Sequence, residues 1–403
     1  MFTAIIGGGL QGIEAAYLSL KAGRQVMIID KNPLAPAARL GHIFLREDVT
    51  KREDLFRLLP GVDLVIPALE NDAAIAAIID GCQAGDMPLA FDGAAYALSA
   101  SKIESDELFA RLGIPAPLPW PRAKFPLIAK PSESSGSRGV KIIRSRAELE
   151  AVFPGPGAAK DWVLQEYIKG PSYSLEVVGV PGFYRALQVT DLEMDAVFDC
   201  KRVTAPTRLA PELCERFVEI SLQIAAAISL KGIMDVEVIL HEGQLKVLEI
   251  DARLPSQTPV TVFWSTGINM VEMLGDLAAQ GNTTDSSNKT QSKVFAGVQG
   301  AVFSKSAPCS PKAKKNKIAN PRGVVLEHIK VSGNTLQVCG ERIMKDAGTL
   351  CIQPGFFGAD EAIGDYAEGK RDWVATLIVS GADCEEAWNK RNAVIKNIKQ
   401  HIK

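Results

Sequence analysis

The chain opens with a strand, a glycine-rich turn and a helix, and this beginning constrains the fold more than any other feature. Residues 2–6 are apolar, four glycines follow within residues 7–12, and a second apolar run occupies residues 25–30. Another strand and helix follow within residues 63–79. Alternating strands and helices predict a parallel sheet covered by helices, so we expect a Rossmann-like N-terminal domain at residues 1–98.

The glycines have the spacing Gly7-x-Gly9-x-x-Gly12, and Asp30 ends the next strand. This pattern matches the dinucleotide-binding fingerprint in sequence and context, and taken alone it predicts NAD and an oxidoreductase. Tight packing of the first turn is the alternative explanation, because such sheets carry many functions. The segments that follow favour the alternative.

The composition excludes several classes of protein. The 403 residues are 47% hydrophobic with a net charge of -2, which predicts two or three packed units and no nucleic-acid or membrane surface. The seven cysteines include no close pair at metal-ligand spacing, which is typical of a reducing compartment. No apolar stretch reaches the ~20 residues of a membrane helix. We therefore expect a cytoplasmic protein with a small-molecule partner.

A loop of small residues follows the strand that ends at Lys130. The loop, Ser134-Ser135-Gly136-Ser137, exposes backbone N–H groups, and Lys130 supplies a positive charge for a polyphosphate. A flexible surface hairpin explains the loop equally well. Lys102, which begins a helix at residues 102–112, is either a second cation of the site or a solvated helix residue. The loop lies among short strands, typical of an antiparallel sheet, at residues 127–130, 140–143, 162–167 and 174–178.

Two apolar strands joined by a four-residue turn carry three carboxylates: Glu237 on the first strand, and Glu249 and Asp251 on the second. Residues two apart on a strand share a face, and a hairpin brings Glu237 beside the other two. Adjacent carboxylates repel one another unless a cation such as Mg²⁺ binds them and takes its other oxygen ligands from a triphosphate. A charged exposed face is the alternative, but the rest of the second strand is apolar. Arg253, just beyond the strand, is suited to neutralise developing negative charge.

These features occur in the order found in the ATP-grasp superfamily. Within it, the chain resembles the pyrrolysine-biosynthesis ligases, which join 3-methylornithine to L-lysine. The resemblance covers most of residues 1–275, and its most specific motifs are Lys231-Gly-Ile-Met-Asp-Val-Glu237, Glu249-Ile-Asp-Ala-Arg253 and Pro255-Ser-Gln-Thr-Pro259. The chain departs from the family pattern at Gly9, where an archaeal relative has lysine. It also departs after Gly170, where an acid for the ribose is usual.

The resemblance implies an α/β ATP-grasp fold. The implied domains are the Rossmann-like domain at 1–98, a two-lobed α+β ATP-grasp domain with antiparallel sheets at 99–275 and a C-terminal α+β domain at 276–403. The ATP-grasp domain would include a small lid at roughly 122–180. We expect strands near 323–330 and 372–379, a basic C-terminal helix, and mobile loops at 281–293 and 305–322.

The resemblance also implies a role for individual residues. Arg253 and Lys130 would be catalytic, and Glu237, Glu249 and Asp251 would bind Mg²⁺. ATP would contact Lys102, Lys130, Ser134, Ser135, Gly136, Ser137, Gln165, Glu166, Tyr167 and Ile168, with further nucleotide contacts at Gly9, Asp30, Asp48 and Val49. L-lysine would contact Leu10, Gln11 and Glu70. The ornithine substrate would contact Ser174, Leu175, Glu176, Arg253, Ser256, Gln257 and Thr258.

The implied reaction is an ATP-dependent ligation. The carboxylate of (3R)-3-methyl-D-ornithine becomes an acyl phosphate, and the ε-amine of L-lysine attacks it to give 3-methyl-D-ornithyl-Nε-L-lysine, ADP and phosphate. The alternatives are another ATP-grasp carboxylate–amine ligase of amino-acid or purine metabolism, an NAD-dependent oxidoreductase and a non-catalytic binding protein. The Ser174-Leu-Glu176 and Pro255–Pro259 motifs argue against the first alternative. The carboxylate hairpin argues against the oxidoreductase. A binding protein would retain the sheet but would not require Glu237, Glu249 and Asp251 together.

Overall fold

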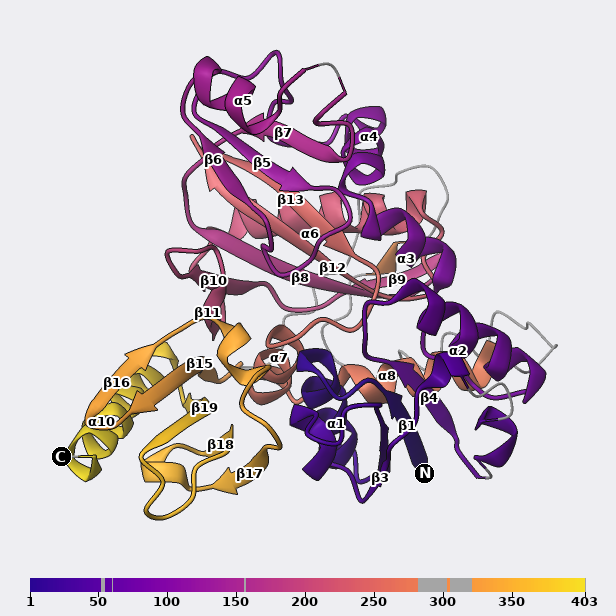
Figure 1. Ribbon diagram of the computed structural model, residues 1–403, viewed down its shortest axis with the longest axis vertical. Coiled ribbons are helices and arrows are strands. Elements are labelled where there is room, and N and C mark those ends of the chain that lie inside the picture. Colours follow the sequence, from indigo (N-terminus) through magenta and orange to yellow (C-terminus); the bar gives the residue numbers. More distant parts are fainter. Residues whose placement is uncertain (52–54, 60, 156, 282–302, 305–320, 403) are drawn as a thin grey trace.

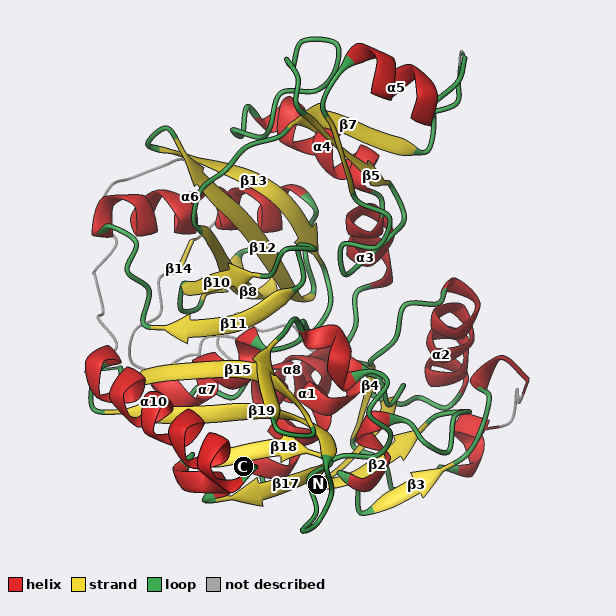
Figure 2. Ribbon diagram, turned by 60° about the vertical axis from the view of Figure 1, so that its left-hand side comes forward, coloured by secondary structure: helices red, strands yellow, loops and turns green. Residues whose placement is uncertain are grey.

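The computed structural model describes residues 1–51, 55–59, 61–155, 157–281, 303–304 and 321–402. Most of the two loops predicted at 281–293 and 305–322 lies outside these residues. The described chain forms three sheets, of four, three and twelve strands (Figure 1). The small sheet lies at one end of the molecule, and the N-terminal and C-terminal parts lie side by side at the other (Figure 1 and Figure 2).

The N-terminal sheet is parallel, with the strand order β3-β2-β1-β4, as the alternating pattern predicts. The short strand β3 was the one strand of this sheet that the pattern did not indicate, because three residues carry little periodic signal. The elements of this part are β1 (Phe2–Ile6), α1 (Leu10–Lys21), β2 (Gln25–Ile29), η1 (Pro36–Arg39), β3 (Ile43–Leu45), η2 (Val49–Lys51), η3 (Leu55–Leu58), β4 (Leu64–Pro67), α2 (Asp72–Ala84) and α3 (Gly93–Ala100).

Backbone conformation and packing require glycine at two positions of the first turn, Gly7 and Gly12. Gly7 has φ +107°, and a Cβ on Gly12 would lie 2.2 Å from the carbonyl oxygen of Gly7. The Gly8 amide donates to the Asp30 carboxylate at 2.7 Å, which fixes the turn against the next strand. Gly7, Gly12 and Asp30 of the fingerprint therefore have structural roles in this turn.

The small sheet is antiparallel, with the order β6-β5-β7. The sequence pattern groups residues 174–178 with these short strands, but β8 (Ser172–Val180) pairs with β10 and β12 in the large sheet. The seven central residues of β8 are buried, which needs layers on both faces that a three-stranded sheet does not supply. Around the small sheet lie α4 (Lys102–Leu112), β5 (Leu127–Pro131), β6 (Lys141–Ile143), α5 (Arg146–Val152) and β7 (Trp162–Glu166).

The large sheet has the order β13-β12-β8-β10-β11-β15-β19-β18-β17, and β9, β14 and β16 branch from it. Strand pairing thus continues from the central part of the chain into the C-terminal part, where the predicted strands and final helix are confirmed. The remaining elements are β9 (Phe183–Ala186), β10 (Thr190–Met194), β11 (Cys200–Ala205), α6 (Pro211–Ala227), β12 (Gly232–His241), β13 (Gln244–Asp251), α7 (Thr258–Thr266), α8 (Met270–Gly281), β14 (Phe303–Ser304), β15 (Gly323–Ser332), β16 (Thr335–Val338), η4 (Glu341–Met344), β17 (Cys351–Pro354), η5 (Phe356–Gly358), β18 (Glu361–Gly364), β19 (Asp372–Gly381) and α10 (Cys384–His401).

A buried ion-pair network lies where β11, β15 and α10 meet. Glu327 is fully buried and accepts from Nε and Nη2 of Arg202 at 2.9 and 2.6 Å. It also accepts from Nε and Nη2 of Arg391 at 2.6 and 2.8 Å. Because both guanidinium groups converge on one buried carboxylate, Glu327 fixes how the C-terminal helix joins the sheet.

Across the described part of the chain, helices long and apolar enough to span a membrane are absent. The six cysteines that lie in this part are all free thiols.

Candidate active site

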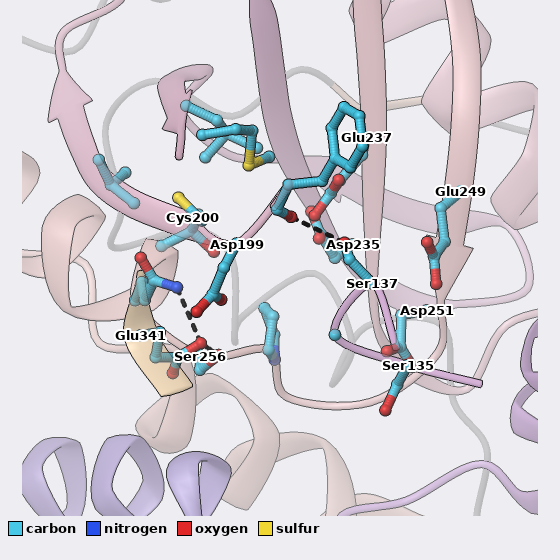
Figure 3. A pocket seen from close by; sticks show the side chains of 18 of the residues that line it. Ser135, Ser137, Asp199, Cys200, Asp235, Glu237, Glu249, Asp251, Ser256 and Glu341 are labelled. Atoms are coloured by element: carbon cyan, nitrogen blue, oxygen red, sulfur yellow. Dashed lines mark hydrogen bonds between the residues drawn. The ribbon is translucent and has the colours of Figure 1, made fainter. Parts of the chain in front are cut away.

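Two cavities adjoin between the small sheet and the large sheet. The lid cavity, of about 320 Å³, is lined by residues of β5 and β7 on one side and of the β12–β13 hairpin on the other. The inner cavity, of about 160 Å³, extends from the hairpin to the loop at residues 253–258. The two share the lining residues Ser137, Met194, Phe198, Glu237 and Glu249. The carboxylate hairpin therefore lies where the cavities meet. Figure 3 shows Glu237, Glu249 and Asp251 of the hairpin at the inner cavity.

The two predicted lysines come together in the lid cavity. Lys102 Nζ lies 3.0 Å from Glu249 Oε1 and donates to the Ser134 carbonyl at 2.5 Å. Lys130 Nζ donates to the Leu248 carbonyl at 3.2 Å. Burial lowers the pKa of the Lys130 ammonium, although Glu249 partly opposes this effect. Lys102 is thus part of the site and is not a solvated helix residue.

The predicted hinge also lines the lid cavity, through Gln165, Glu166, Tyr167 and Ile168. Gln165 is buried, and its Oε1 has no hydrogen-bond partner. Glu166 accepts from the Leu118 amide at 3.0 Å and pairs with Lys246, so its side chain is already engaged. A ligand at the hinge would therefore meet backbone groups and the free Gln165 oxygen.

The serine and glycine loop is divided between the two cavities. Ser134 lines the lid cavity, Ser135 and Gly136 line the inner cavity, and Ser137 lines both. The Ser135 hydroxyl donates to Glu70, and Arg342 donates to the Gly136 carbonyl. The loop thus contacts the N-terminal and C-terminal parts of the chain as well as the cavities.

The hairpin register places the carboxylates on one face, as the strand pattern predicts. Glu237 pairs with Glu249, and Asp235 pairs with Asp251. Burial raises the pKa of Glu237 well above its usual value, and the charges of Asp235 and Glu249 raise it further. Within the described residues, groups of three His, Cys, Asp or Glu side chains arranged to hold a metal ion are absent.

Arg253 lies between Asp251 and Glu70. Its Nη2 is 2.6 Å from Asp251 Oδ2 and 2.5 Å from Glu70 Oε1, while its buried Nε has no hydrogen-bond partner. Gln11 donates from Nε2 to Glu70 Oε1 at 3.0 Å. Two of the residues predicted to bind L-lysine, Gln11 and Glu70, are therefore brought to Arg253. The third, Leu10, lines a smaller neighbouring cavity.

The residues predicted to bind the ornithine substrate divide into two groups. Ser256, Gln257 and Thr258 line the inner cavity with Arg253. Ser174 and Glu176 lie behind its wall, where the Ser174 hydroxyl donates to Asp235 at 2.5 Å.

Neither Leu175 nor Glu176 lines the inner cavity. Leu175 packs in the hydrophobic core, because the strand alternation turns it to the opposite face. Glu176 is fully buried, and both its carboxylate oxygens lack a hydrogen-bond partner. Burial, followed by the charge of Asp235, raises the pKa of Glu176 to about 8. The nearby Thr258 hydroxyl lowers this pKa without forming a well-aligned hydrogen bond.

The four further nucleotide contacts predicted in the first domain are not brought to either cavity. Asp30 holds the glycine turn, Asp48 accepts from the Thr50 amide and hydroxyl, and Val49 packs in the core. A Cβ on Gly9 would meet nothing within 4 Å, so this position has room for a longer side chain.

Several lining residues have no counterpart in the sequence-based list. Asp195 lines the lid cavity, and Asp199, Asp235 and Glu341 line the inner cavity. The sequence-based list missed Asp235, although strand alternation could have found it, since it lies two residues before Glu237 on the same face. Asp195 and Asp199 flank a turn and Glu341 belongs to a short 3₁₀ helix, where no periodic signal exists.

Comparison with known proteins agrees with this geometry. A family model described as an ATP-grasp domain matches residues 99–257. The chain is 41% identical to the 3-methyl-D-ornithine--L-lysine ligase of Methanosarcina mazei, over 99% of this chain and 95% of that protein. The ligase of the same name from Methanosarcina acetivorans is 34% identical over 99% of this chain and 98% of its own length.

A solved structure shares the fold at low sequence identity. The L-amino acid ligase from Bacillus licheniformis superposes with a TM-score of 0.67 at 16% identity, covering 98% of this chain and 97% of that chain. Its likeness shows that the two chains share a fold. With the full-length identity to the Methanosarcina enzymes, it follows that the chain belongs to the 3-methyl-D-ornithine--L-lysine ligase family of ATP-grasp enzymes.

Proposed function

We propose that the protein is an ATP-dependent ligase that joins 3-methyl-D-ornithine to the ε-amine of L-lysine, a step of pyrrolysine biosynthesis. The observation that carries the proposal is the meeting of the lid cavity and the inner cavity at Glu237 and Glu249. A nucleotide in the first cavity and a carboxylate substrate in the second would meet at these residues. The related ligases of Methanosarcina carry the same substrates in their names.

The lid cavity suits ATP with Mg²⁺. Lys102 and Lys130 supply positive charge for phosphates, and the hinge offers backbone groups and the unpartnered Gln165 Oε1 for a base. Glu237 and Glu249 lie opposite each other, and their mutual repulsion fits a site for a divalent cation. Since Mg²⁺ commonly takes one or two carboxylates and completes its shell with phosphate oxygens, a preformed three-residue cage is not required. When bound, Mg²⁺ would neutralise charge on the phosphates during transfer.

Arg253 would act on the reacting carboxylate. One of its nitrogens is held by Asp251 and Glu70, which fixes the guanidinium, and the unpartnered Nε remains to donate to the substrate. A fixed donor of this kind stabilises the charge that develops as the carboxylate accepts the γ-phosphoryl group and the acyl phosphate forms. The charge of Arg253 also favours attack by a neutral amine, because it withdraws electrons from the carbonyl oxygen.

L-lysine would approach from the side of the N-terminal domain. Glu70 and Gln11 lie there, and a carboxylate and an amide together suit the α-amino and α-carboxyl groups of an amino acid. Closure of the small sheet over the lid cavity would exclude water from the acyl phosphate. We place the reaction in the cytoplasm, consistent with the free thiols of the described cysteines.

Product formation with each component omitted in turn tests this proposal. The purified protein is mixed with ATP, Mg²⁺, 3-methyl-D-ornithine and L-lysine, and ADP is measured alongside the mass of the product. We expect ADP together with a condensed dipeptide only in the complete mixture. If ADP is released at the same rate without either amino acid, the substrate assignment is refuted. If no ADP forms in the complete mixture, the ligase activity itself is refuted.

A further inference from the structure

The loop that lines the inner cavity contains a strained turn just before α7. Gln257 has φ +70° and ψ -54°, and the Thr258 amide donates to the Ser256 carbonyl at 2.8 Å. These values define a γ-turn with positive φ, a rare and strained conformation for a residue that carries a side chain. Ser256, Gln257 and Thr258 all line the inner cavity. The turn therefore sets the position of three side chains predicted to bind the ornithine substrate.

The first turn of α7 leaves one amide to be satisfied from outside the helix. Thr258 donates within the γ-turn, Pro259 has no N–H group, and the Thr261 amide bonds to the carbonyl of the residue before the helix at 3.1 Å. That residue supplies no side-chain cap. The remaining amide, that of Val260, donates to Glu14 Oε1 at 2.6 Å. Glu14 thus provides the cap that the residues next to α7 do not supply.

Glu14 belongs to α1, in the N-terminal part of the chain, which lies beside α7 (Figure 1 and Figure 2). Its side chain is buried, one helical turn from Gln11, a predicted contact of L-lysine. Burial raises the pKa of Glu14 to about 8, whereas the amides of Val260 and Gln257 lower it. Because burial of a carboxyl group is unfavourable unless it is hydrogen-bonded, the backbone of this loop is an essential partner of Glu14.

A second carboxylate, from the C-terminal part of the chain, binds the side chains of the same turn. Glu341 Oε2 accepts from the Ser256 hydroxyl at 2.9 Å and from Gln257 Nε2 at 2.8 Å (Figure 3). Glu341 therefore fixes side chains, whereas Glu14 is bonded to the backbone. Glu14 is not among the residues that line the lid cavity or the inner cavity. It can act on a substrate only through the turn.

We propose that Glu14 is a positioning residue that holds the strained turn at Gln257 in the conformation that binds the ornithine substrate. The assignment rests on the proposed function. Without an acceptor at position 14, the buried Val260 amide would lose its partner, and Gln257 would relax to a negative φ. The hydroxyl groups of Ser256 and Thr258 would then move away from the substrate, and small displacements of this kind weaken binding and catalysis.

Glu14→Leu tests this role, because leucine fills the buried space but accepts no hydrogen bond. We expect the KM for 3-methyl-D-ornithine to rise by about tenfold or more, with the KM for ATP within about twofold. Glu14→Gln keeps a carbonyl oxygen for the Val260 amide and should hold the KM within about threefold of the unmodified protein. Tyr17→Phe is the matched control, since it removes a hydroxyl to which Trp264 Nε1 on α7 donates at 2.8 Å and leaves the turn untouched. It should keep the KM for 3-methyl-D-ornithine.

Relief of the strain separates positioning from a general structural role. Glycine adopts a positive φ without strain, so in Gln257→Gly the turn no longer depends on Glu14. In that background, Glu14→Leu should change the KM for 3-methyl-D-ornithine by no more than about twofold. An equal fold-change in both backgrounds would overturn the proposal. A rise in Tyr17→Phe as large as that in Glu14→Leu would also overturn it, because the effect would then come from the packing of α1 on α7.

A crystal structure of Glu14→Leu tests the proposal without any activity measurement. We expect a negative φ at Gln257 and loss of the hydrogen bond between the Thr258 amide and the Ser256 carbonyl. If the unmodified protein forms no ligation product, the proposed function fails, and this structure still decides whether Glu14 holds the turn. Retention of the γ-turn in Glu14→Leu would overturn the role of Glu14 and leave the proposed function intact.

Discussion

Replacing Arg253 by lysine separates its structural and catalytic contributions. Both ion pairs of Arg253 use one nitrogen, Nη2, at 2.5 Å from Glu70 and 2.6 Å from Asp251. A lysine ammonium has a single nitrogen and carries the same charge, so Arg253→Lys retains a cation between the two carboxylates. It lacks the buried Nε donor that has no protein partner. Loss of one donor to transition-state charge costs ~10²–10³ in kcat, which we expect for Arg253→Lys.

The measurement combines turnover with stability. The kcat is obtained from ADP release coupled to product mass, and the melting temperature reports on the fold. Arg216→Lys, on the exposed face of α6, serves as a control for the substitution itself and should keep full activity. A kcat for Arg253→Lys within about threefold of the unmodified protein, at an unchanged melting temperature, would refute the role of Nε in transition-state stabilisation.

Three further outcomes follow from single contacts. Glu249→Gln should raise the Mg²⁺ concentration for half-maximal activity by about tenfold or more, measured as ADP release against total Mg²⁺, and an unchanged Mg²⁺ dependence would exclude Glu249 as a ligand. Glu327→Gln leaves the Arg391 guanidinium without its counter-charge and Arg202 with Glu193 alone, and it should lower the free energy of unfolding in urea by ~3–5 kcal/mol while the KM values stay constant. Burial lowers the pKa of His328 from 6.5 to about 3, so the unfolded chain binds the extra proton between these values. The contribution of His328 to the free energy of unfolding is therefore fully present above about pH 6.5. It is lost as the pH falls towards 3, by up to about 1.4 kcal/mol per pH unit. His328→Gln should flatten this slope in unfolding measurements between pH 4 and pH 6, and an equal slope in both proteins would contradict the assignment.

Local periodicity predicted most of the elements around the site. The alternation of β12 and β13 indicated that Glu237, Glu249 and Asp251 share a face, and the register confirms this arrangement. The strand–turn–helix opening predicted the parallel sheet, and α4 begins at Lys102 and ends at Leu112 as expected. These features depend on residues close in sequence, whose side-chain directions follow from the backbone repeat.

Sheet membership was harder to predict for β8. Its residues 174–178 resemble any short apolar strand, and the choice between the small and large sheets depends on which partner strands cover its edges. The division of the chain at residues 98 and 275 stays a prediction. Strand pairing between β11 and β15 shows that the large sheet extends beyond the second of these boundaries.

The chemical groups of the site could be read from the amino-acid sequence: two lysines, a small-residue loop, a carboxylate hairpin and an arginine beyond it. The tertiary structure alone decided that Glu70 from the first domain meets Arg253 and that Glu341 from the C-terminal part faces the inner cavity. These residues are 183 and 85 positions away from Arg253 and Ser256 in the chain. Such contacts follow from how whole domains pack, and no local repeat in the sequence encodes that packing.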